Sequence, residues 1–189
     1  MEAFLVSTGV VVLAEMGDKT QLLALLLAVR FRRPLPIIAG IFVATIINHT
    51  IAGAVGTWIT AAVGPHALRW VLGASFIGMA IWALVPDKLD SDESRIARFG
   101  VFGTTVLAFF LAEMGDKTQI ATVALAAKYS AVYSVVAGTT LGMMLADVPA
   151  VLLGERVTKM VPARVIRVVA AVVFLILGAM ALLNVGRLL

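Results

Sequence analysis

The sequence predicts an all-α membrane protein with six transmembrane helices, arranged as two inverted-topology repeats of three helices each. Three observations lead to this expectation: the composition, six long apolar segments and an internal repeat. The chain has 189 residues, of which 61% are hydrophobic and 14% charged, and its mean hydropathy is +1.05. A soluble domain carries about 25% charged residues. Lipid is therefore expected to cover much of the surface of this protein.

Six apolar segments are long enough to cross hydrocarbon, which takes roughly 20 residues of helix. They cover residues 3–29, 35–62, 68–85, 101–127, 131–153 and 165–186. The first is expected to be retained rather than cleaved as a signal peptide, because Met1 and Glu2 supply no positive charge ahead of it. A polar run follows the third segment and resembles a linker. We therefore expect a first repeat over residues 1–86, a cytoplasmic linker over 87–98 and a second repeat over 99–189.

Basic residues predict the orientation of these helices in the membrane. Ten lie after the first, third and fifth segments, namely Arg30, Arg32, Arg33, Lys88, Arg95, Arg98, Arg156, Lys159, Arg164 and Arg167. The opposite side has only Arg69, Lys128 and Arg187. Because cytoplasmic loops are enriched in lysine and arginine, both termini are expected outside the cytoplasm.

The composition also excludes several kinds of chemistry. The chain has no cysteine, so disulfides, thiolate metal sites and thiol nucleophiles are absent. The net charge of +4 comes from dispersed loop residues rather than from a dense basic patch, which argues against nucleic-acid binding. No feature of the sequence calls for a prosthetic group.

A nine-residue motif, Leu-Ala-Glu-Met-Gly-Asp-Lys-Thr-Gln, occurs twice, at residues 13–21 and again at residues 111–119. The same offset of 98 residues pairs Gly40 with Gly138, so the duplication extends beyond the motif. Each half contains three predicted helices, and an odd number of spans reverses the orientation of the second copy. Inverted repeats of this kind are typical of secondary transporters, which bind their substrate where the repeats meet.

The repeated motif is expected to bind a divalent cation. The two copies together contain four acids and two lysines. Their net charge is minus two, which a divalent cation neutralises. Oxygen donors of this kind suit Ca²⁺, Mg²⁺ or Mn²⁺. The candidate ligands are Glu15, Asp18, Thr20, Gln21, Glu113, Asp116, Thr118 and Gln119, and Lys19 and Lys117 balance their charge.

Two alternatives concern the local structure of the motif. Glu15 and Lys19 are four residues apart, so they would pair within one helical turn, but this leaves Asp18 without a counter-charge. On an unbroken helix Thr20 points well away from Glu15. The central glycine of each motif serves either close helix packing or a local unwinding that relieves this separation.

Two further polar residues occupy equivalent positions in the two halves. His49 and Asp147 are also 98 residues apart, and both lie within apolar segments. Ionisable groups inside a membrane commonly mark ion or proton pathways. Both are candidates for a proton relay, although a lone histidine is more often a hydrogen-bonded packing residue.

The paired motifs resemble those of the Gdt-type cation exchangers, a branch of the cation/calcium exchanger group. The pattern Glu-x-Gly-Asp-[Lys/Arg]-[Ser/Thr] of that family is matched at every position, at residues 15–20 and 113–118. The resemblance implies transport of Mn²⁺ or Ca²⁺ against protons, with the motif acids binding the ion. The short linker is similar to that of prokaryotic members, which resemble the Mne manganese exporters of the bacterial inner membrane.

Taken together, these features predict a membrane antiporter that exports Mn²⁺, or also Ca²⁺, in exchange for protons. The alternatives are a divalent-cation channel without obligatory proton coupling, and an intramembrane enzyme that uses paired carboxylates as acid and base. The enzyme is disfavoured because a lysine accompanies each acid pair and no serine nucleophile does. The sequence is compatible with a monomer or a homodimer.

Overall fold

The computed structural model describes residues 1–85, 99–153 and 163–183, and the regular structure in these ranges is entirely helical. This confirms the predicted all-α class for the described part of the chain. The helices are α1 (Glu2–Glu15), α2 (Lys19–Phe31), α3 (Pro34–Ala62), α4 (Pro65–Ala83), α5 (Gly100–Glu113), α6 (Lys117–Tyr129), α7 (Val132–Leu153) and α9 (Ala163–Leu182). The expected linker at 87–98 and the basic residues Arg156, Lys159 and Arg187 lie outside the described ranges.

The middle helices of the two halves, α3 and α7, are each long and apolar enough to cross a membrane. They coincide with the second and fifth predicted segments, and α4 and α9 with the third and sixth. The first and fourth segments differ from expectation, because each consists of two helices rather than one. In both cases the interruption lies inside the repeated motif.

Glycine produces each interruption. Gly17 has a φ angle of 78° and Gly115 one of 76°, both in the left-handed region. An L-residue with a side chain pays roughly 1–2 kcal/mol to adopt this conformation, and glycine does not. Of the two roles that the sequence left open for these glycines, the structure therefore shows local unwinding of the helix.

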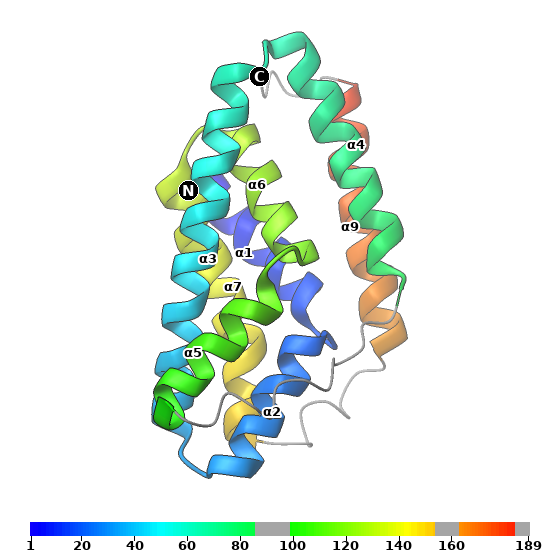
Figure 1. The fold of residues 1–189 in the computed structure, drawn as a ribbon. Helices are drawn as coiled ribbons and strands as arrows, with labels where there is room; N and C mark the ends of the chain where they lie inside the picture. Colours follow the sequence, from blue (N-terminus) through cyan, green and yellow to red (C-terminus); the bar gives the residue numbers. More distant parts are fainter. Residues whose placement is uncertain (86–98, 154–162, 184–189) are drawn as a thin grey trace.

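Most helix contacts join one half of the chain to the other, so the two halves are not separate units. The interrupted pair α1 and α2 lies along α7, and the pair α5 and α6 lies along α3. In Figure 1, α1, α2 and α4 run downwards and α3 upwards, whereas α5, α6 and α9 run upwards and α7 downwards. The third helices of the two halves, α4 and α9, pack together along their length.

Equivalent glycines allow the closest of these contacts. A Cβ atom at Gly138 of α7 would lie 2.4 Å from the Phe4 carbonyl oxygen of α1. A Cβ atom at Gly40 of α3 would lie 2.7 Å from the Thr105 Cβ atom of α5 and 3.1 Å from the Phe102 carbonyl oxygen. Phe102 is 98 residues after Phe4, just as Gly138 is 98 after Gly40. The same contact thus recurs at both places where a middle helix meets the first helix of the other half.

The distribution of side chains is that of a protein surrounded by hydrocarbon. Large apolar side chains lie on the outside, for example Trp58 and Ile81, which are 69% and 65% exposed. The acids Glu15, Glu113 and Asp147 are instead completely buried. Because ionisable groups are costly in lipid, they are expected to face the interior of a membrane bundle.

Candidate metal site

The four motif acids lie at the ends of the interrupted helices. Glu15 is the last residue of α1 and Glu113 the last of α5, while Asp18 and Asp116 precede α2 and α6 as N-cap residues. All four are buried. One carboxylate oxygen each from Glu15, Glu113 and Asp116 lie within 4.8 Å of one another, close enough to coordinate a single metal ion. The cluster therefore combines acids from both halves of the chain.

Ion pairs join the motifs across the two halves. Lys19 Nζ lies 3.1 Å from Asp116 Oδ1, and Lys117 forms the equivalent pair with Asp18. Each lysine occupies the first turn of a helix, where the helix dipole disfavours a positive charge, and each aspartate caps the other helix, where the dipole favours a negative one. The pairing is thus between motifs, and not the local pairing of Glu15 with Lys19 that the sequence also allowed.

These ion pairs leave the glutamates to set the charge of the cluster. Each lysine neutralises one aspartate, so the four charges of the two pairs sum to zero. Glu15 and Glu113 remain, and as carboxylates they carry two negative charges together. The cluster thus matches a cation of charge two that prefers oxygen ligands.

The motif threonines hold the glutamates across the helix breaks. Thr20 Oγ1 donates a hydrogen bond of 2.5 Å to Glu15 Oε2, and Thr118 Oγ1 donates one of 2.8 Å to Glu113 Oε2. The second oxygen of each glutamate, Oε1, is buried and makes no hydrogen bond within the described residues. Each threonine thus fixes one oxygen and leaves the other available to a ligand.

Replacing Thr118 by valine is expected to weaken metal binding about tenfold, since a lost hydrogen bond to a charged group costs roughly 1.5–3 kcal/mol. Valine keeps the shape of threonine and removes only the hydroxyl group. Thr118→Ser, which retains the hydroxyl, is the matched control and is expected to bind nearly as well as the unaltered protein. Titration of purified protein with Mn²⁺, followed by electron paramagnetic resonance of the free ion, measures the affinity. Equal affinities for the two variants would contradict the positioning role.

The motif glutamines form hydrogen bonds with the backbone at the two helix breaks. The side-chain oxygen of Gln21 accepts a hydrogen bond of 3.0 Å from the Gly17 N–H, and that of Gln119 accepts one of 2.7 Å from the Gly115 N–H. The Gln21 amide group also donates to the Ala146 carbonyl oxygen of α7. The structure therefore gives each glutamine oxygen a backbone partner beside the cluster.

Asn48 of α3, next to His49, contacts the end of α5 close to the motif. Its side-chain amide donates a hydrogen bond of 3.1 Å to the Phe110 carbonyl oxygen, in the last turn of α5. The last four carbonyl groups of a helix lack partners within that helix, and Asn48 supplies one here. The only signal in the sequence was an amide next to His49 in an otherwise apolar segment.

The two proton-relay candidates are both buried in the middle helices. Asp147 of α7 interacts electrostatically with both Glu15 and Glu113, so it lies near the cluster. Its two oxygens form no hydrogen bond with other described residues. The ring nitrogens of His49 in α3 are likewise buried and have no hydrogen-bond partner there. Both residues are thus buried polar groups without a hydrogen-bond partner among the described residues, and their role in proton transfer stays a prediction.

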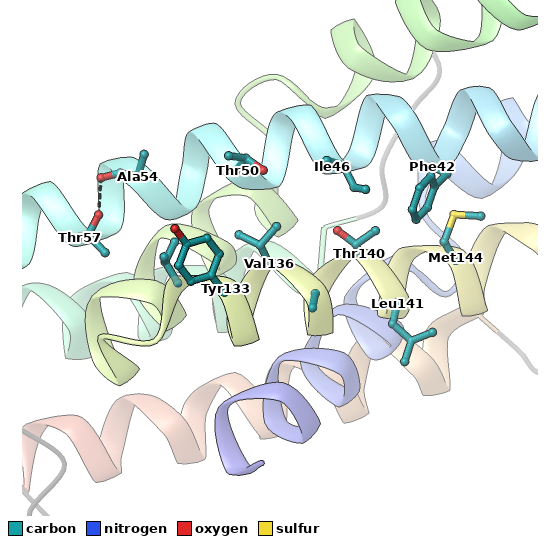
Figure 2. Close-up of a pocket in the computed structure, with 12 residues that line it drawn as sticks. Phe42, Ile46, Thr50, Ala54, Thr57, Tyr133, Val136, Thr140, Leu141 and Met144 are labelled. Carbon is teal, nitrogen blue, oxygen red and sulfur yellow. Dashed lines mark hydrogen bonds between the residues drawn. The ribbon is translucent and has the colours of Figure 1, made fainter.

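A separate groove of about 620 Å³ lies between α3 and α7. Figure 2 shows Phe42 and Ile46 of α3 on one side of it, and Thr140 and Met144 of α7 on the other. None of the motif residues lines this groove. Its mostly apolar lining suits hydrocarbon rather than a metal ion, so the acidic cluster is the candidate functional site.

In the described residues, helices with an apolar surface bury a cluster of carboxylates at paired helix breaks, which is the arrangement expected of a membrane protein that binds cations. Comparison with known families agrees: the profile described as "Divalent cation/proton antiporter GDT1" matches residues 3–91 and 101–187. The chain belongs to this family. The family is one of transporters rather than enzymes, which agrees with the expectation from the sequence.

Named relatives extend the comparison. A Vibrio cholerae protein named "Putative manganese exporter" is 52% identical over 88% of this chain and 83% of its own. A GDT1-like protein of Synechocystis is 28% identical over 88% and 89% of the two chains, and GDT1-like protein 5 of Arabidopsis thaliana is 27% identical over 97% and 96%. No solved structure shows a significant match. The family and these relatives support cation transport, and the Vibrio cholerae relative is the one named for manganese among these three.

Proposed function

We propose that the protein is a secondary transporter that exports Mn²⁺ from the cytoplasm in exchange for protons, and that it also accepts Ca²⁺. The observation that carries this proposal is the buried group of Glu15, Glu113 and Asp116, which brings oxygen ligands from both motifs to one place. The relative from Vibrio cholerae, which is named for manganese export, supports Mn²⁺ as the cargo and export as the direction.

The cation binds to one free oxygen from each glutamate and to the free oxygen of Asp116. Glu15 Oε1, Glu113 Oε1 and Asp116 Oδ2 are all buried and make no hydrogen bonds with the described residues, so they are available for coordination. Thr20 and Thr118 orient the glutamates, and Gln21 and Gln119 support the breaks beside them. Lys19 and Lys117 balance the aspartates.

The site lies between two inverted-topology repeats of three transmembrane spans each, residues 1–86 and 99–189. In this arrangement α1 with α2, and α5 with α6, each form one interrupted span. The opposite directions of equivalent helices and the matching contacts of Gly40 and Gly138 support it. Interrupted helices that meet at the midplane are the usual binding element of transporters with inverted repeats.

Protons and the metal ion compete for the same carboxylates. Asp147 carries a proton to or from Glu15 and Glu113, with which it interacts electrostatically. His49, at the equivalent position in α3 of the first half, is the second proton carrier. Protonation of the glutamates removes the negative charge that holds the cation, so entry of protons from outside releases the metal there. Exchange of Mn²⁺ for protons then follows from this competition, and Asp147 is the group through which protons reach the glutamates.

The protein is placed in the bacterial inner membrane with both termini outside the cytoplasm. Arg30 at the end of α2, with Arg32 and Arg33 in the turn to α3, lies on the side that this orientation assigns to the cytoplasm. Arginine-rich short loops favour that side.

Transport into liposomes tests the proposal. Purified protein is reconstituted with a Mn²⁺-sensitive dye in the lumen, and a pH gradient is imposed. An acidic lumen is expected to drive Mn²⁺ inwards, and Mn²⁺ entry is expected to make the lumen more alkaline. Asp147→Asn is expected to lose this proton-driven uptake and to retain exchange of Mn²⁺ for Mn²⁺. Flux that follows the membrane potential and ignores the pH gradient would instead identify a channel.

A further inference from the structure

The two lysine–aspartate pairs of the site are equivalent in sequence but not in environment. The Lys19 side chain is 24% exposed, whereas the Lys117 side chain is 4% exposed. Their partners, Asp116 and Asp18, are both buried. The Lys19–Asp116 pair therefore borders accessible space, and the Lys117–Asp18 pair is enclosed by protein.

The two aspartates also differ in their relation to the glutamates. Asp116 contributes an oxygen to the three-carboxylate group with Glu15 and Glu113, while its Oδ1 atom contacts Lys19. Asp18 is paired with Lys117 and is not part of that group. The aspartate of the accessible pair is thus the one positioned beside the glutamates.

Building on the proposed function, we propose that the two aspartates exchange roles during transport. Glu15 and Glu113 are ligands in both metal-bound arrangements of the site. When the site opens to one face, Asp116 is the third ligand and the Lys117–Asp18 pair closes the other face. When the site opens to the opposite face, Asp18 becomes the third ligand and the Lys19–Asp116 pair closes the first.

The duplication of the motif provides the physical basis for this exchange. Because the two motifs are identical in sequence, the same side chains are available for the same contacts in both arrangements. Each lysine keeps an aspartate partner in both arrangements, so no buried ammonium group is left uncompensated, which would cost several kcal/mol. An element with two discrete arrangements of similar energy is what a switching transition requires.

Exchange of radioactive Mn²⁺ against unlabelled Mn²⁺, measured in right-side-out and in inverted membrane vesicles, tests the proposal. The apparent KM is determined on each face for Asp116→Asn and for Asp18→Asn. Loss of one charged ligand is expected to raise KM by roughly tenfold or more. Asp116→Asn is expected to do so on one face, with little change on the other, and Asp18→Asn is expected to show the reverse pattern.

Other patterns would overturn the exchange of roles. If Asp116→Asn raises KM on both faces and Asp18→Asn on neither, Asp116 is a permanent ligand and Asp18 is structural. If each variant raises KM on both faces, the two aspartates bind at the same time. Absence of Mn²⁺ exchange by the unaltered protein on both faces would instead contradict the proposed function itself, so the two failures are distinguishable.

Matched double variants cover the case in which a single variant fails to fold. Asp18→Asn with Lys117→Gln, and Asp116→Asn with Lys19→Gln, each remove a whole ion pair and leave no unpaired buried lysine. The opposite face preferences are expected for these two as well. Similar KM changes on both faces in both variants would contradict the proposal.

The absence of native cysteine allows an independent measurement. Lys19→Cys and Lys117→Cys each introduce a single thiol, which a membrane-impermeant thiol reagent modifies where it is accessible. The two positions are expected to react from opposite faces of the membrane. Reaction of both from the same face would overturn the proposal, and restoration of Mn²⁺ exchange by an aminoethyl reagent shows that the modified protein is folded.

Discussion

Glu113→Gln is expected to reduce Mn²⁺ transport to the background of protein-free liposomes. The substitution keeps the size of the side chain and its hydrogen bond with Thr118, and it removes one of the two negative charges that balance the ion. In a buried site the remaining carboxylates then carry too little charge for a divalent cation. A loss of about 3 kcal/mol or more in binding free energy lowers the affinity by roughly 100-fold or more. Initial rates of Mn²⁺ uptake into proteoliposomes measure it.

Two further variants make the Glu113 result specific. Glu15→Gln is the equivalent change in the first motif and is expected to have the same effect. Glu2→Gln is the matched control, because Glu2 lies at the exposed start of α1 and its side chain accepts a hydrogen bond from Tyr129, away from the motif. It is expected to transport normally. Undiminished transport by Glu113→Gln would contradict its role as a ligand.

Gly138→Ala is expected to destabilise the fold by about 2–3 kcal/mol, within the range for overpacked cores. The new methyl group would lie 2.4 Å from the Phe4 carbonyl oxygen, which belongs to the backbone of α1 and therefore cannot simply rotate away. Separation of α1 from α7 would also displace Glu15 at the end of α1. Thermal unfolding in detergent, with Mn²⁺ uptake measured alongside, gives both effects.

Gly9→Ala is the matched control for Gly138→Ala. A Cβ atom at Gly9 would meet no atom within 4 Å, and this residue lies in the interior of α1. Alanine is favoured over glycine there by roughly 0.5–1 kcal/mol, so a neutral or slightly stabilising effect is expected. If both substitutions change the unfolding temperature equally, the close contact between Gly138 and Phe4 is not the cause of the destabilisation.

Much of the fold follows from the sequence because hydrophobic length and helix propensity act locally. The apolar segments at 35–62 and 131–153 correspond closely to α3 and α7. The segments at 3–29 and 101–127 were expected as single spans, but each is divided at its motif. Periodicity does not reveal such a break, because glycine is compatible both with a helix and with the left-handed turn that interrupts it.

The candidate site was predictable as a set of residues more than as an arrangement. The repeated motif indicated carboxylates, lysines and a divalent cation, and the structure brings Glu15, Glu113 and Asp116 together. The sequence left open a local unwinding that would bring Thr20 towards Glu15, but the hydrogen bond between them could not be predicted, because it exists only where the helix is broken. It also gave no sign of the bond from Asn48 to α5, which depends on the contact of α3 with the other half.

The sequence alone determined that this protein is helical, that its surface suits lipid and that two identical acidic motifs occupy apolar segments. Composition and repetition can be counted along the chain without knowing how it folds. Only the tertiary structure decided that each lysine pairs with the aspartate of the other motif, and that Asp116 rather than Asp18 stands with the two glutamates. These choices depend on how two distant segments approach each other, and identical motifs cannot express a difference that arises from their surroundings.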